Sequence, residues 1–251
     1  MTYKAKAPSK KTDQLGFRPK RFWSGTSTIE TKNGFEIHLD SRPVKTPKGH
    51  LLVLPTHHLA QLIEGEWAGV VEYVEFTDMP LTRLGFASVD RIGEVQDTLV
   101  AEVLRYAETD LLCYPSEYPA ALQVREDAIW LPVLAWTERG LGLHFHQNRT
   151  LIHKPQPMET LERLRTIVLV ANTFEQAGIM LAIPLLGSVV LSLALWKGHL
   201  TGMAAFTASR IGEDFQAETW GQDAEATKRT EGMRRDAVSL ETWFKSLSQR
   251  N

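Results

Sequence analysis

The uncharged segment from Gln176 to Trp196 reads Q-A-G-I-M-L-A-I-P-L-L-G-S-V-V-L-S-L-A-L-W, and it decides the fold. Its length approaches the roughly 20 apolar residues that a membrane-spanning helix requires. Three residues that disfavour a helix interior, Gly178, Pro184 and Gly187, interrupt it, and its flanks are amphipathic charged helices without an aromatic belt. We therefore predict two buried helices, broken near Pro184, at the centre of a helical domain. A membrane span is the alternative.

Helical periodicity continues on both sides of this segment and predicts an all-α domain over residues 93–251. Two amphipathic helices are predicted before the uncharged segment. The apolar set of the first is Val95, Leu99, Val103 and Tyr106, and that of the second is Leu161, Leu164, Val168 and Ala171. Two more are expected at about 200–219 and 222–247. The run from Ala128 to Trp136 is apolar on nearly every side, so it is either enclosed by other helices or offered to a partner. Enclosure is the commoner outcome, and we expect it here.

Residues 21–92 have the pattern of a small α+β domain. Asn33-Gly34 is a strong hairpin signal, and the strand that follows it, Phe35 to Leu39, alternates apolar and polar residues. Pro55-Thr56 then opens a helix whose apolar stripe includes Trp67. The fold class is therefore α+β, with a small N-terminal α/β sandwich-like domain followed by a larger all-α domain.

Residues 1–20 form a basic segment that we expect to be a flexible arm. Its charges are Lys4, Lys6, Lys10, Lys11, Arg18 and Lys20, against Asp13. A nucleic-acid binder concentrates its basic residues on a folded face, whereas here they lie on a short polar arm. The arm is also Lys-rich and poorly amphipathic, unlike a targeting peptide. The single Cys113 cannot form an intramolecular disulfide and fits a reducing compartment. These features favour a cytoplasmic protein, or an organelle matrix protein after processing, that binds no nucleic acid.

Motifs for catalysis are scarce. The sequence lacks G-x-G-x-x-G, the phosphate-binding G-x-x-x-x-G-K-[ST] and the G-x-S-x-G elbow. His144 and His146 alternate on a predicted strand and share a face, but no acidic or cysteine ligand accompanies them at a suitable spacing. Asp40, Arg42 and Lys45 cluster at a turn, where they could grip an anion, although an Asp40–Arg42 pair that braces the turn is more ordinary. We expect no enzyme, cofactor or metal; the alternative is a small-molecule or metal-dependent enzyme built on these two groups.

A surface helix is predicted near the C-terminus, where residues 209–226 read S-R-I-G-E-D-F-Q-A-E-T-W-G-Q-D-A-E-A. In one continuous helix Ile211 and Phe215 lie on a buried stripe, and Glu213 points away from it. Phe206, seven residues earlier, shares the outward face. A ring and a carboxylate on one outward face suit a partner-binding surface, to which we add Trp220. A solvated acid beside a neighbouring helix is the alternative.

Seven sequence blocks in order resemble the ATP synthase F1 assembly chaperones, specifically the family that binds the α subunit. The blocks are R-F-W at Arg21, L-D-S-R-P-V-K-T-P at Leu39, L-P-T-H-H-L-A-Q-L-I-E-G-E-W ending at Trp67, M-P-L-T-R-L at Met79, T-D-L-L-C-Y at Thr109, W-L-P-V-L-A-W at Trp130 and the stretch 209–226. The resemblance covers almost everything after the basic arm. At Leu131 the chain departs from the acidic residue that the family tends to have before the proline.

The resemblance implies a chaperone without catalytic activity that holds the unassembled α subunit and shields its interface until the β subunit displaces it. It also implies that Glu213 is the family's functional acidic position, with Asp214 as the alternative register. The residues themselves predict structural roles for Trp67, on its helical apolar stripe, and for Asp40 and Arg42, at their turn. The expected partner is the α subunit, and the expected state is a monomer without stable membrane insertion. A bacterial relative would act in the cytoplasm, and a processed organelle form in the mitochondrial matrix.

Overall fold

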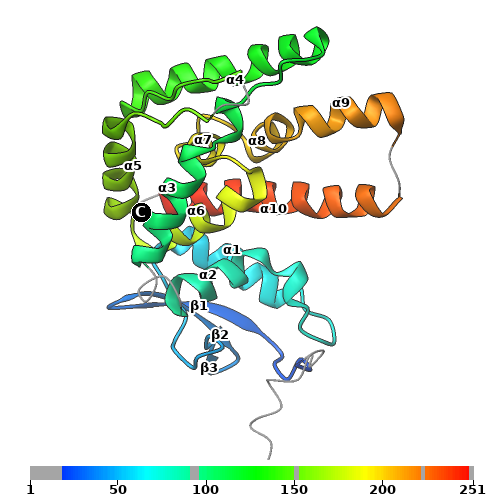
Figure 1. Ribbon diagram of the computed structural model, residues 1–251. Helices are drawn as coiled ribbons and strands as arrows, with labels where there is room; N and C mark the ends of the chain where they lie inside the picture. The colour runs from blue at the N-terminus through cyan, green and yellow to red at the C-terminus, as the bar shows by residue number, and fades with distance from the viewer. Residues whose placement is uncertain (1–18, 91–95, 150–152, 222–223, 249–251) are drawn as a thin grey trace, which may run out of the picture.

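A computed structural model describes residues 19–90, 96–149, 153–221 and 224–248, and it shows a small antiparallel sheet followed by a mostly helical region (Figure 1). This confirms the α+β class. The predicted flexible arm lies outside the described residues except for its last two, Pro19 and Lys20. The backbone N–H of Val74 donates to the Pro19 carbonyl at 2.8 Å, and Lys20 forms an antiparallel bridge with Tyr73. The described chain therefore begins as an extended segment fixed against the loop after the first helix.

The predicted hairpin forms at Asn33-Gly34. The sheet consists of β1 (Thr26–Thr31), β2 (Gly34–Leu39), β3 (Arg42–Pro43) and β4 (Val53–Leu54). β2 pairs with β1 on one edge, and with both β3 and β4 on the other. Gly34 has a φ of +133°, and a Cβ at this position would lie 2.4 Å from the Leu54 carbonyl oxygen. Only glycine allows this close approach between the hairpin and β4.

Helix α1 (His57–Ala68) covers the sheet and starts where the sequence predicts. The Thr56 hydroxyl accepts the Leu59 backbone N–H and so caps the helix. Trp67 is 6% exposed, as the periodicity predicts. Its ring packs edge-on against Trp23, with centroids 5.5 Å apart, and against Phe76 at 6.3 Å. Three aromatic rings thus fill the junction between the N-terminal segment, α1 and the loop after it.

The remaining elements are helices. They are η2 (Phe76–Asp78), α2 (Pro80–Asp90), α3 (Gln96–Glu108), η4 (Leu111–Cys113), α4 (Ala120–Leu141), α5 (Met158–Val170), α6 (Thr173–Leu186), α7 (Val189–Trp196), α8 (Gly202–Ser209), α9 (Ile211–Trp220) and α10 (Ala224–Ser248). Helix α2 contacts α6 and α10, and one apolar core continues from Trp23 to Phe244. The sheet and the helical region therefore share a packed interface.

The uncharged segment forms the centre of the helical region as two helices, α6 and α7, and every residue of α7 is buried. The break lies at Gly187 rather than near Pro184, which lies inside α6. Gly187 has a φ of 62° and ends α6 in the left-handed conformation, and the Ser188 side chain then caps α7. Within the described ranges, no helix combines the length and apolarity needed to cross a bilayer.

Asp110 is a fully buried carboxylate at the start of α7. It accepts hydrogen bonds from the Ser188 hydroxyl at 2.9 Å and from the backbone N–H groups of Val190 and Leu112, each at 3.0 Å. Burial raises the pKa of Asp110 to about 6, although these donors counteract the shift. The network fixes the α3–α4 connection against the central helices.

We expect Asp110→Asn to remove a pH dependence of folding stability. Because the folded-state pKa of about 6 exceeds the ordinary 3.8, folding takes up a proton, so stability falls as pH rises between these values. The full shift corresponds to about 3 kcal/mol. Urea unfolding of both proteins from about pH 4 to pH 7 should show the wild type losing that much stability relative to the variant. Parallel pH profiles for the two proteins would contradict the buried carboxyl group.

Close packing of α8 against α10 depends on Gly202. A Cβ at this position would lie 2.2 Å from the Ala237 backbone oxygen, and Glu241 accepts the Gly202 N–H at 2.6 Å. Because backbone cannot move aside as a flexible side chain can, Gly202→Val should destabilise the protein by about 3 kcal/mol. Gly212→Ala in α9 is the control, since nothing lies within 4 Å of its Cβ position. Equal denaturation midpoints for the two variants would refute this packing.

Candidate functional site

Helix α9 projects from the helical region and is the least buried of the helices near the C-terminus. Only Ile211 of its residues is buried. Figure 1 shows α9 and the first half of α10 extending to one side, beyond the core of packed helices. The side chain of Glu213 is exposed, that of Asp214 is half-exposed, and Trp220 at the end of the helix is 78% exposed. We refer to Glu213, Asp214 and Trp220 as the α9 surface.

Phe206 does not belong to this surface, which corrects the sequence-based expectation. Its side chain is 5% exposed and lies in the core. The expectation assumed one continuous helix, but α8 ends at Ser209 and α9 begins at Ile211, with Arg210 between them. The angular relation of about 100° per residue does not carry across that break. Phe206 therefore points inward even though Glu213 points outward.

Arg210 occupies the break and stays close to both acids of the α9 surface. Its Nη1 lies 3.9 Å from Glu213 Oε1, and its Nε lies 3.7 Å from Asp214 Oδ1. Its guanidinium also lies over the Phe206 ring, 5.9 Å from the centroid. The acid side chains of these ion pairs are exposed, whereas the Arg210 side chain is largely buried. Because both pairs are long and their acids are solvated, they contribute little to stability. The outer side of both carboxylates therefore stays open to solvent.

The inner side of α9 is attached to α4. The Arg125 Nη1 donates to both carboxylate oxygens of Glu218, at 2.8 and 2.9 Å, and the guanidinium covers the Phe215 ring at 5.1 Å. Deeper in the same junction, Trp130 Nε1 donates to the Ala208 carbonyl at 2.9 Å. These contacts hold α9 alongside α4, while Glu213, Gln216 and Trp220 are exposed.

Helix α4 adds an exposed apolar ridge beside α9. The run from Ala128 to Trp136 was expected to be enclosed, and the structure encloses one side only, where Trp130 and Val133 are buried. On the outer side Val124 is 69% exposed and Leu131 is 44% exposed. With Ala128 and Ala135, these residues follow helical spacing along one strip, which we call the α4 ridge. Since α4 and α9 pack against each other, the α9 surface and the α4 ridge lie on adjoining helices.

The structure gives Asp40 and Arg42 separate partners, so the expected pair between them does not form. Asp40 has a φ of 54°, and its carboxylate accepts the backbone N–H groups of Ser24 and Gly25 at 3.0 and 2.9 Å. Arg42 lies over the Phe22 ring at 5.5 Å. Lys45 is exposed and forms a backbone bridge with Leu51. Asp40 therefore holds the turn through backbone donors rather than through Arg42.

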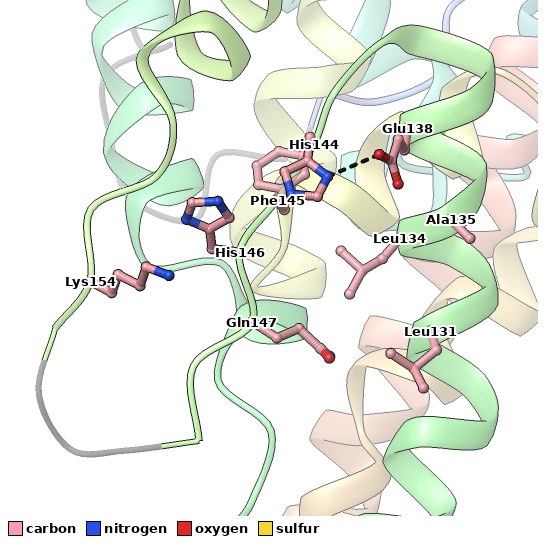
Figure 2. A pocket seen from close by; sticks show the side chains of 9 residues that line it. All are labelled: Leu131, Leu134, Ala135, Glu138, His144, Phe145, His146, Gln147 and Lys154. Atoms are coloured by element: carbon pink, nitrogen blue, oxygen red, sulfur yellow. Dashed lines mark hydrogen bonds and ion pairs between the residues drawn. The ribbon is translucent and has the colours of Figure 1, made fainter.

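His144 and His146 do come together, although the segment that contains them is irregular rather than a strand. Their rings meet edge to face with centroids 5.4 Å apart, and His144 Nδ1 lies 3.0 Å from Glu138 Oε1. They line a cavity of about 370 Å³ beside α4, which we call the His–Lys pocket because Lys154 lines it too (Figure 2). In the part of the chain that the structure describes, no group of three or more His, Cys, Asp or Glu residues could hold a metal ion.

Cys113 is fully buried, and burial raises the pKa of its thiol well above the ordinary value. The neighbouring Asp110 carboxylate adds to that shift. Nucleophilic chemistry requires a thiolate, and low-pKa cysteines occur at partly exposed, electropositive sites. Cys113 thus has the environment of a packing residue.

Comparison with known proteins gives concordant results. The family description "ATP12 chaperone protein" matches residues 20–138. The chain is 31% identical to Atp12 from Paracoccus denitrificans, over 91% of this chain and 98% of that one, with a TM-score of 0.86. An aspartate-to-lysine mutant of the Paracoccus protein also superposes with a TM-score of 0.86. The mitochondrial protein atp12 of Schizosaccharomyces pombe is 28% identical over 87% of this chain and 78% of its own length.

The fold is therefore that of a chaperone with an N-terminal sheet and a helical region. The chain belongs to the ATP12 chaperone family, as the seven sequence blocks indicated. This is a family of chaperones for ATP synthase assembly rather than a family of enzymes.

Sequence reasoning missed the residues that organise the site. Arg125 holds α9 through Glu218, a partner on another helix, and Arg210 lies at the break between α8 and α9. The signal that was available is the apolar outer strip of α4, which reads as helical spacing from Val124 to Ala135 once the helix is taken as one long element. The strip is not apparent when only Ala128 to Trp136 is considered, because Val124 lies outside that range.

Proposed function

We propose that this protein binds the unassembled α subunit of the ATP synthase catalytic head and shields its interface until the β subunit displaces it. The observation that carries the proposal is that two helices in contact with each other carry the acidic α9 surface and the apolar α4 ridge. A ring subunit exposes apolar interfaces before assembly, and such surfaces aggregate. The α4 ridge offers apolar area to cover them, and Glu213 adds a charge that fixes the orientation of the client.

Release in this scheme needs no chemical step. The β subunit binds the same client surface, and at a sufficient concentration it displaces the chaperone by mass action. The chaperone must therefore bind with moderate affinity, and a small surface with few anchor residues suits that requirement. We propose that Trp220 is one anchor, since a large aromatic side chain that is 78% exposed is expensive to leave in water.

The test is co-expression of this protein with the α subunit of the same organism, followed by co-purification. We expect soluble α in a complex with the chaperone, and added β should release the chaperone. If α aggregates to the same extent with and without this protein, the proposal is wrong. Light scattering of the purified chaperone tests the proposed monomer. We propose that this binding takes place in the bacterial cytoplasm, or in the mitochondrial matrix for an organelle form.

A further inference from the structure

The His–Lys pocket lies beside α4. Helix α4 contributes its apolar wall through Leu131, Leu134 and Ala135, and the chain segment that returns alongside α4 contributes His144, His146 and Lys154 (Figure 2). Leu131 belongs to both the pocket and the ridge. One side of a bound segment could therefore remain in contact with apolar atoms while the other side meets cationic groups.

The wall formed by His144 and His146 is held in place before any ligand binds. Gln156 is almost fully buried, and its side chain forms two hydrogen bonds with the His146 backbone, accepting its N–H at 2.8 Å and donating to its carbonyl at 3.1 Å. The Thr160 hydroxyl donates to the His144 carbonyl at 2.6 Å. These bonds fix the returning segment to α5 and its preceding loop, and Figure 2 shows the His144 ring toward Glu138 of α4 and the His146 ring on the side of Lys154.

Lys154 is the cation of the pocket that has no ion-pair partner among the described residues. Its single carboxylate, Glu138, pairs with His144 at 3.0 Å. No carboxylate of the described residues pairs with Lys154, and His146 Nδ1 is buried without a hydrogen-bond partner in that part of the chain. Burial lowers the pKa of His146, and the charges of Lys154 and His144 lower it further. The lowered pKa favours neutral His146, so Lys154 is the charged group that a carboxylate would meet, and the His146 ring can add a hydrogen bond.

We propose that the His–Lys pocket binds a carboxylate side chain of the client protein, whose neighbouring apolar side chain packs on the α4 ridge at Leu131. The inference rests on the function proposed above, because it makes the pocket a second contact for the same client. Charge complementarity selects an acidic residue of the client, and the apolar wall selects a flanking aliphatic or aromatic side chain. The pocket's small volume, about 370 Å³, suits one side chain rather than a whole folded element.

The pocket and the α9 surface together define the orientation of the client. Both adjoin α4, which meets α9 through Arg125 and lines the pocket through Leu131 and Leu134, and they differ in charge, with Glu213 and Asp214 on α9 and Lys154 in the pocket. A client segment would therefore cross α4 with a basic side chain toward Glu213 and an acidic side chain toward Lys154. A reversed segment would place like charges together at both ends and would bind more weakly. Repulsion of this kind is how charges fix the register of an interface.

Two measurements on the full-length protein test the proposal, with the α subunit of the same organism as the probe. First, Lys154→Glu should lower the affinity for α by about tenfold. The matched control Lys32→Glu reverses an exposed charge in the β1–β2 turn and should change the affinity less than about twofold. Second, the photo-cross-linker p-benzoylphenylalanine at Leu131 should capture α, whereas the same group at the exposed Val71 should not.

Each measurement can overturn the inference. If Lys154→Glu binds α as the wild type does, or if Leu131 cross-links no better than Val71, the pocket is not a client contact. Either result leaves the proposed function intact as long as the wild type still captures α. Failure of the wild type to capture α refutes the proposed function itself. Equal loss of α binding with Lys32→Glu would show a nonspecific charge effect and would also refute the pocket.

Discussion

Replacing Trp67 with arginine should abolish most of the folding stability of this protein. The indole is 6% exposed and packs against Trp23 and Phe76, so the substitution removes a large apolar side chain and introduces a charge without a partner. Loss of the ring alone corresponds to about 3–5 kcal/mol. The buried charge adds to this loss. Since small domains have a total stability of about 5–15 kcal/mol, we expect insoluble or largely unfolded protein.

The matched control is Trp220→Arg, which makes the same chemical change at a side chain that is 78% exposed. It should change the unfolding free energy by less than about 0.5 kcal/mol. Urea denaturation followed by circular dichroism, together with the soluble fraction after expression, measures both variants. A Trp67→Arg protein as soluble and as stable as the control would show that Trp67 is not part of the core. Trp67→Phe should recover most of the stability, because an aromatic ring remains.

Local signals predicted the elements that depend on local chemistry. Asn33-Gly34 predicted the hairpin, Thr56 predicted the start of α1, and the spacing of apolar residues predicted α3 and α5. The sequence predicted the break of the central segment near Pro184, whereas the structure has it at Gly187. Proline is tolerated inside α6 here, whereas Gly187 adopts the left-handed conformation that ends a helix. Both residues disfavour helix, and only the tertiary structure shows which of them ends it.

The candidate site was predictable only in part, because its residues depend on how helices meet. Glu213 could be placed outward from residues within α9 alone. The placement of Phe206 failed because it required knowledge of the break at Arg210. The spacing of His144 and His146 predicted that they lie together. It did not predict that Lys154 lines the same pocket, because Lys154 lies further along the chain and has no periodic relation to them. Contacts between segments distant in sequence leave no periodic signal.

Glu213→Lys should strongly weaken capture of the α subunit while leaving the protein folded. The carboxylate is exposed and makes only a long ion pair with Arg210, at 3.9 Å, so its loss costs little. A lysine in the first turn of α9 is unfavourable for the helix dipole by about 0.3–1 kcal/mol, which a folded protein of ordinary stability tolerates. At the interface, however, the reversal replaces an attractive charge with a repulsive one, and we expect at least about a tenfold loss of affinity.

Two further variants show whether a loss of affinity comes from the missing negative charge, from the added positive charge, or from charge reversal anywhere on the surface. Glu213→Gln removes the charge alone and should bind α with an affinity between those of the wild type and the lysine variant. Glu30→Lys makes the same reversal at an exposed position on β1 and should bind as the wild type does. Co-purification and a binding titration at low and high salt measure all three, and the difference between them should shrink as salt screens the charge. If Glu213→Lys melts well below the wild type, Glu213 is structural; if it is stable and captures α normally, the α9 surface is not the contact.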